Sequence, residues 1–102
     1  MPRVEVKPGA DMRGLHPKIQ DALLTVAWVY GKLDLKLTFT SGIDGDHSTG
    51  SLHYTGRAVD LRTRHVSQQI KLKIADMLRV ELGWGYEVVV ESTHIHIEWD
   101  PK

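Results

Sequence analysis

The sequence predicts an α+β domain in which two helices cover one face of a mainly antiparallel sheet. Two segments carry apolar residues at helical spacing, 17–31 and 67–83. Four others have the pattern of strands: 35–40, 57–63, 86–92 and 93–99. A chain of 102 residues has room for one hydrophobic core. We therefore expect a single domain over residues 16–102, preceded by a lead-in segment at residues 1–15.

Both helices have recognisable ends. The first is predicted to begin at Pro17, because proline fits the first helical position, and to stop at Gly31. Its apolar residues share one side: Ile19, Leu23, Val26, Ala27 and Tyr30. The second is predicted to follow a cap at Ser67 and to end at Gly83. Its stripe comprises Ile70, Ile74, Met77 and Leu78.

A long polar loop connects two of the predicted strands. LKLTFT, residues 35–40, alternates apolar and polar side chains, as half-buried strands do. The glycine-rich loop 41–51 separates this strand from RAVDLRT, residues 57–63. YEVVVES and THIHIEW then follow each other closely, which predicts two neighbouring strands at the end of the chain.

Strand parity separates core residues from candidate site residues. In THIHIEW, His94 and His96 alternate with two isoleucines, and in RAVDLRT, Val59 and Leu61 flank Asp60. Successive side chains of a strand point to opposite faces. If the apolar residues face the helices, Asp60, His94 and His96 share the open face of the sheet, where we expect a zinc site.

The composition limits the chemistry. The 13 basic and 13 acidic residues cancel, so there is no general attraction to nucleic acid or to an anionic membrane. There is no cysteine, which leaves the six histidines and the carboxylates as strong transition-metal ligands. No apolar run resembles a signal peptide or a membrane span, and we therefore expect a cytoplasmic protein.

The candidate residues match a catalytic zinc site. Such a site commonly has three protein ligands and a water, whose pKa zinc lowers to about 7. His53, Asp60 and His96 can supply the ligands. Glu91, at the end of the preceding strand, is the nearest carboxylate in sequence that could accept a proton from the water, and His94 could stabilise an oxyanion.

Each residue also has a structural interpretation. A single histidine on a strand usually serves the structure or faces solvent. Asp60, unfavourable in mid-strand, can be explained by a salt bridge to Arg57 or Arg62. Glu91 alone would be a surface acid beside a turn, and Gly56 alone a turn residue. The combination, rather than any one residue, favours a functional site.

The pattern S-x-H-x-x-G-x-A-x-D at residues 51–60, followed by H-x-H at 94–96, resembles the zinc D-alanyl-D-alanine metallopeptidase superfamily. That superfamily includes bacterial carboxypeptidases and dipeptidases, phage L-alanyl-D-glutamate endopeptidases and the amino-terminal signalling domain of hedgehog proteins. The likeness covers residues 16–100 and is most evident for the hedgehog domain, which suggests a bacterial or phage hedgehog-like peptidase. It implies zinc ligands at His53, Asp60 and His96, a base at Glu91, and His94 beside the metal.

The resemblance also assigns residues around the zinc. His47 matches a histidine that lines the hedgehog zinc groove, and Asp44 and Asp46 match part of its calcium-binding loop. Ser41 stands where a further acidic residue is expected, which implies weak or no calcium binding. The turn from Glu91 is one residue shorter than in hedgehog, so His94 is an alternative third ligand to His96.

The substrate side of the site is less defined. No arginine precedes the loop to hold a substrate carboxylate, unless Arg57, Arg62 or Arg64 does so. The choice between an exopeptidase and an endopeptidase therefore stays open.

The resemblance implies a monomeric zinc-dependent peptidase acting on peptidoglycan-type peptides, as a D-Ala-D-Ala carboxypeptidase or dipeptidase or an L-Ala-D-Glu endopeptidase. Such an enzyme would act in the cytoplasm or reach the cell wall during phage lysis. One alternative is a catalytically silent, hedgehog-like, zinc-containing binding module. Another is a metal-dependent single-strand nuclease, which would need Tyr30 as its nucleophile and for which the zero net charge is unfavourable.

Overall fold

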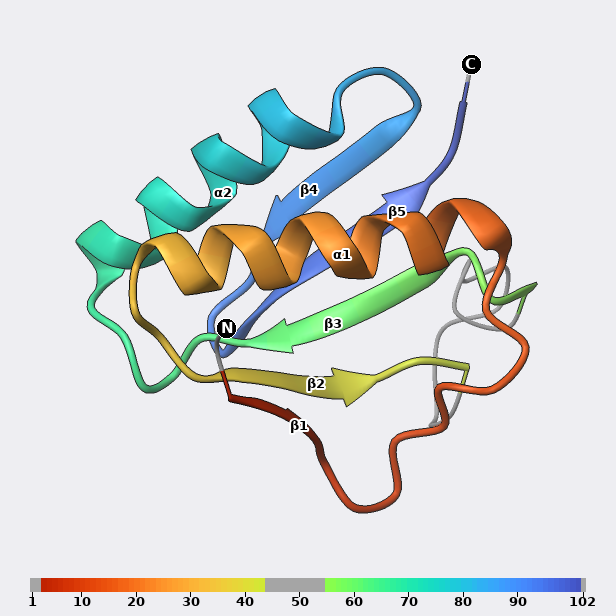
Figure 1. Ribbon diagram of the computed structural model, residues 1–102, viewed down its shortest axis with the longest axis horizontal. Helices are drawn as coiled ribbons and strands as arrows, with labels where there is room; N and C mark the ends of the chain where they lie inside the picture. Colours follow the sequence, from red (N-terminus) through yellow and green to blue (C-terminus); the bar gives the residue numbers. More distant parts are fainter. Residues whose placement is uncertain (1–2, 44–54, 102) are drawn as a thin grey trace.

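The computed structural model describes residues 3–43 and 55–101 and has two layers, a five-stranded sheet and a pair of helices (Figure 1). Its elements are β1 (Val4–Val6), α1 (Pro17–Lys32), β2 (Leu37–Ser41), β3 (Ala58–Arg62), α2 (Gln68–Leu82), β4 (Tyr86–Val90) and β5 (His94–Trp99). Both helices lie on the same face of the sheet, as the sequence predicts. The candidate site lies on the other face of the sheet, which the helices do not cover.

The sheet is mixed. Its strand order is β1-β2-β3-β5-β4, and the pairings β2–β3, β3–β5 and β4–β5 are antiparallel. The predicted antiparallel sheet is therefore correct for these strands, but β1 pairs with β2 in parallel. This edge strand lies within the segment expected to be a lead-in. Its three residues are too short for a periodic signal, and the pairing depends on contacts distant in sequence.

The core lies between the helices and one face of the central strands. Val59 and Leu61 of β3 and Ile95 and Ile97 of β5 are fully buried. They pack against apolar side chains of both helices, including Val26. Removal of this apolar surface from water is the main stabilising contribution to such a layer. Neither helix of the described segments is both long and apolar enough to cross a bilayer.

Helix ends follow the predicted residues with one exception. The Ser67 side chain accepts a hydrogen bond from the Ile70 backbone N–H, and Gly83 caps the other end of α2 with a positive φ. Helix α1 begins at Pro17 but continues past Gly31 to Lys32. Asp34 adopts the left-handed conformation (φ 55°) after the helix, a conformation that aspartate tolerates better than most residues.

Gly56 fixes the approach to β3. Its φ is +72°, and a Cβ at this position would collide with the backbone carbonyl oxygen of Gly14. The Gly56 carbonyl also accepts a hydrogen bond from the His16 backbone N–H at 2.8 Å. A glycine is therefore required here to join the start of α1 to the start of the strand that carries Asp60.

Candidate metal centre

Strands β3 and β5 bring the central candidate residues together on the open face of the sheet. Their antiparallel register pairs Asp60 with His96 and Arg62 with His94. Directly opposed residues in such a pair have neighbouring side chains on the same face. The strand parity predicted from the sequence therefore holds for Asp60, His94 and His96.

Asp60, His96 and Glu98 form a hydrogen-bonded row. His96 Nδ1 lies 2.9 Å from Asp60 Oδ1, and His96 Nε2 lies 2.9 Å from Glu98 Oε1. Asp60 is 8% exposed, and the side chains of His96 and Glu98 are 17% and 18% exposed. Both ring nitrogens thus face a carboxylate in a largely buried setting.

The two carboxylates change the protonation of His96. Burial lowers the pKa of His96, but the hydrogen bonds and charges of Asp60 and Glu98 outweigh it, and the pKa is raised above its ordinary value of 6.5. The imidazolium can donate to both carboxylates. In the neutral imidazole only one nitrogen carries a proton, so a metal ion at Nδ1 would leave Nε2–H to donate to Glu98.

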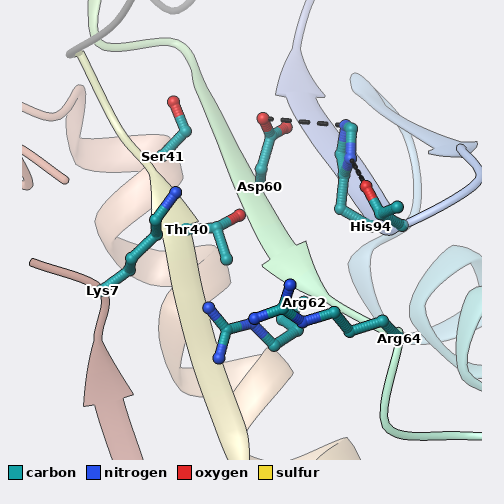
Figure 2. A pocket seen from close by; sticks show the side chains of 8 residues that line it. Lys7, Thr40, Ser41, Asp60, Arg62, Arg64 and His94 are labelled. Atoms are coloured by element: carbon teal, nitrogen blue, oxygen red, sulfur yellow. Dashed lines mark hydrogen bonds and ion pairs between the residues drawn. The ribbon is translucent and has the colours of Figure 1, made fainter. Parts of the chain in front are cut away.

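His94 lies beside this row. Its Nε2 is 3.8 Å from Asp60 Oδ2, longer than a hydrogen bond, and its Nδ1 is 3.3 Å from the Thr93 hydroxyl (Figure 2). When the hydroxyl donates to Nδ1, Nε2 carries the ring proton and faces Asp60. His94 then offers a hydrogen-bond donor to anything bound next to Asp60.

Glu91 stands at the end of β4. Its backbone N–H donates to the His94 carbonyl at 2.9 Å, which places Glu91 opposite His94, and its side chain is exposed. The ammonium of Lys71, a residue only 6% exposed, donates to the carbonyls of Glu91 and Ser92 at 3.0 and 2.9 Å. Helix α2 therefore holds the turn between Glu91 and His94 from the core side.

A pocket of about 340 Å³ opens next to these residues (Figure 2). Its volume is within the range of small-molecule sites. It is lined by Lys7, Thr40, Ser41, Asp60, Arg62, Arg64, Thr93 and His94. The pocket thus joins the edge of the candidate metal centre to the ends of β1, β2 and β3.

The donor set fits zinc in chemistry. An imidazole nitrogen and a carboxylate oxygen 2.9 Å apart, with a second carboxylate on the far ring nitrogen, match the ligands and the outer hydrogen bond of zinc sites. Among the described residues the ion pairs of Asp60 are with His94 and His96, rather than with Arg57 or Arg62. Among the described residues, a salt bridge to arginine therefore does not explain why an aspartate occupies this mid-strand position.

Four predicted site residues are not described by the structure, and one described residue lies apart from the pocket. His53, His47, Asp44 and Asp46 lie outside the described residues. Arg57 is exposed before β3 and does not line the pocket, whereas Arg62 does. The ligand set, the base and the calcium positions therefore stay predictions.

A second group of acidic side chains lies near the same strands. Within the described part of the chain, Glu87, Glu98 and Asp100 offer three ligand atoms within 4.8 Å of one another. Three carboxylates suit a hard cation such as Ca²⁺ better than zinc, and exposed acids are common without any ion. Glu98 is shared between the two groups, so substitutions at Glu87 can separate them.

The tyrosine required by the nuclease alternative is inaccessible. Tyr30 is fully buried, and its hydroxyl lies 3.4 Å from the Arg62 carbonyl. Burial also raises the pKa of Tyr30, which opposes formation of a nucleophilic phenolate. Helix α1 therefore does not supply that nucleophile.

Sequence reasoning gave no role to Glu98 or Lys7. The signal for Glu98 was present, because it is two residues from His96 and shares its face. Lys7 reaches the pocket only because β1 joins the sheet, and nothing in its local sequence indicates this.

Comparisons with known proteins agree with this architecture. The family model of the hedgehog amino-terminal signalling domain matches residues 13–98. Indian hedgehog B protein of Danio rerio is 34% identical over 96 residues, covering 90% of this chain and 23% of that protein. Indian hedgehog protein of Gallus gallus is 41% identical over 64 residues, covering 61% of this chain and 15% of that protein. The chain thus spans less than a quarter of the length of these relatives.

The matches bear on two predictions made from the sequence, the cytoplasmic location and the bacterial or phage peptidase. The cytoplasmic assignment is wrong, because these homologues are secreted signalling proteins and the lack of an apolar leader in the given sequence carries no weight against this. The family model and these two relatives are hedgehog proteins and give no specific support for a bacterial or phage peptidase. Since the family model covers most of the chain, this protein belongs to the hedgehog amino-terminal signalling domain family.

Proposed function

We propose that this domain binds one zinc ion and hydrolyses amide bonds in peptidoglycan-type peptides. The observation that carries the proposal is the row of Asp60, His96 and Glu98, which presents two zinc-type donor atoms 2.9 Å apart beside a pocket. His53, from the motif that resembles the metallopeptidase superfamily, is the proposed third ligand. His96 is preferred over His94 because its nitrogen lies closer to Asp60.

The remaining residues divide the acid–base work. Bound zinc would lower the pKa of a water molecule and polarise the scissile carbonyl. Glu98 holds the His96 ring in one orientation through Nε2. The Glu91 carboxylate accepts the proton of the attacking water and returns it to the leaving nitrogen, and His94 Nε2–H donates to the oxyanion.

A second candidate function is a zinc-containing binding module without turnover. It is favoured by the position of Glu91, whose side chain is exposed and does not line the pocket, and by membership of a signalling-domain family. In that case the pocket would bind a protein or peptide ligand that is released unchanged. The two functions share the metal centre and differ in the role of Glu91.

A peptidase assay on synthetic stem peptides, with D-Ala-D-Ala and L-Ala-D-Glu bonds tested separately, distinguishes them. We expect turnover that a chelator abolishes, and a decrease of at least about 100-fold in Glu91→Gln with zinc retained, since general base catalysis contributes this much. Glu81→Gln, an exposed acid on α2, is the matched control and should turn over normally. Zinc without turnover in the unsubstituted protein would favour the binding module, and normal turnover in Glu91→Gln would exclude Glu91 as the base.

A further inference from the structure

The turn between β4 and β5 carries several groups of the candidate site. Thr93 and His94 line the pocket, and Glu91 is the proposed base. Among the described residues, the backbone closes this turn with one hydrogen bond, from the Glu91 N–H to the His94 carbonyl at 2.9 Å. A directly opposed, hydrogen-bonded pair of antiparallel residues normally exchanges a second, reciprocal bond. The carbonyls of Glu91 and Ser92 therefore require donors from outside the hairpin.

Lys71, near the start of α2, supplies those donors. Its ammonium lies 3.0 and 2.9 Å from the carbonyl oxygens of Glu91 and Ser92, and the residue is only 6% exposed. The next carbonyl of the turn, that of Thr93, accepts a hydrogen bond from the Thr63 N–H at 3.1 Å, just after β3. Three consecutive carbonyls of the turn are thus held by other parts of the fold.

A buried ammonium carries a cost that the packing of the helix does not explain. Lys71 shares the buried side of α2 with Ile74 and Leu78. Within the described part of the chain, it makes no ion pair with a carboxylate. Removing a charge from water is unfavourable, and an apolar side chain of similar length would pack at this position without that cost. The two carbonyls that Lys71 reaches are therefore the reason we assign to its charge.

We propose that Lys71 is a positioning residue that orients Glu91 and His94 by holding the backbone of the turn between them. Its ammonium contacts the turn from the core side, whereas the pocket lies on the open face, so it acts through the backbone alone. The Thr93 hydroxyl, 3.3 Å from His94 Nδ1, moves with the same turn. The inference rests on the proposed function only for the effect on turnover.

Amide hydrogen exchange tests whether Lys71 holds the turn. Lys71→Met keeps most of the aliphatic length and removes the ammonium, and Lys73→Met on the exposed side of α2 is the matched control. We expect exchange at Glu91 and Thr63 to become about tenfold faster in Lys71→Met, because their N–H groups donate to carbonyls of the turn. The Ile97 amide, between β3 and β4, should keep its protection. Lys71→Arg, which retains a donor cation, should keep most of the protection of the turn.

Two further measurements show whether the turn positions the site. Long-range ¹H–¹⁵N spectra report which ring nitrogen carries the proton, and Lys71→Met should change the signals of His94 and leave those of His96. In the peptidase assay, kcat should fall about tenfold at nearly unchanged KM, because a misplaced base slows the reaction rather than the binding of peptide. Lys71→Arg should restore most of this rate.

The outcomes distinguish this proposal from the proposed function. Faster exchange confined to the turn, together with altered His94 signals, supports it even if the unsubstituted domain cleaves no peptide. Unchanged exchange at the turn or unchanged His94 signals would overturn it, as would equal changes in Lys73→Met. Loss of protection throughout the sheet, or failure of Lys71→Met to fold, would also overturn it, because Lys71 would then support the whole domain rather than the turn.

Discussion

The two faces of β3 and β5 differ in what they contribute. On one face Val59, Leu61, Ile95 and Ile97 are fully buried beneath the helices. On the other face the same strands carry the hydrogen-bonded row of Asp60, His96 and Glu98, with His94 beside it. One β-pairing therefore positions both the core and the candidate site. Substitutions on the two faces should affect different properties of the protein.

The core face should dominate stability. We expect Ile97→Ala to lower the free energy of unfolding by about 2–5 kcal/mol, because it removes a fully buried side chain and leaves a cavity. Thermal or urea unfolding measures this, with exposed Val80→Ala on α2 as the control for an apolar deletion at the surface. Folded Ile97→Ala should still bind zinc. Loss of zinc from the folded variant would contradict the separation of the two faces.

The open face should dominate metal binding. We expect His96→Ala to weaken zinc binding by more than about 100-fold, because loss of a ligand costs more than loss of an outer hydrogen bond. Competition with a chromophoric chelator gives the affinity. His94→Ala should reduce turnover more than zinc affinity. If His94→Ala loses the metal and His96→Ala keeps it, the two histidines exchange roles.

Substitutions of Glu98 and Glu87 distinguish two candidate metal sites that share Glu98. We expect Glu98→Gln to weaken zinc binding by about 10–100-fold, the usual effect of removing the partner of a metal-binding histidine. Glu87→Gln, on the neighbouring strand β4, should leave zinc affinity nearly unchanged. The same chelator competition tests both variants. An equal loss in the two would indicate that Glu87, Glu98 and Asp100 hold the ion instead.

Acidification should release the metal. Asp60 and Glu98 outweigh the effect of burial and raise the pKa of His96 above 6.5, so protons begin to compete with zinc at a higher pH than for an ordinary histidine. Below this pKa we expect affinity to fall by roughly tenfold per pH unit for this one proton. Glu98→Gln should move the onset of this decline to lower pH. An onset that does not move would contradict the role of Glu98.

Much of this arrangement follows from local sequence patterns. The periodicity of the apolar residues predicts α1 and α2, and strand parity places Asp60, His94 and His96 on one face, because both depend only on neighbouring residues. The parallel strand β1 and the arrival of Lys7 at the pocket could not be predicted, since three residues carry no period and their pairing is set by distant contacts.

The contacts of Gly56 and Lys71 could not be predicted from local sequence patterns either. The sequence predicts that Gly56 serves a turn, and its φ of +72° agrees with this, but its close approach to Gly14 depends on how the segment before α1 meets the segment before β3. Because lysine is charged, Lys71 would be expected on the exposed side of α2. Its ammonium instead reaches the backbone carbonyls of Glu91 and Ser92. Long side chains can cover apolar surface and still place a charge at a distant backbone, which sequence spacing does not reveal.

Elemental analysis of the purified domain, beside Asp60→Asn and Glu87→Gln prepared in the same way, shows whether the open face of the sheet binds zinc. We expect one zinc per chain in the unsubstituted protein and in Glu87→Gln, and little or none in folded Asp60→Asn. Absence of zinc from all three, or its retention in Asp60→Asn with loss in Glu87→Gln, would contradict a zinc centre on the open face of β3 and β5.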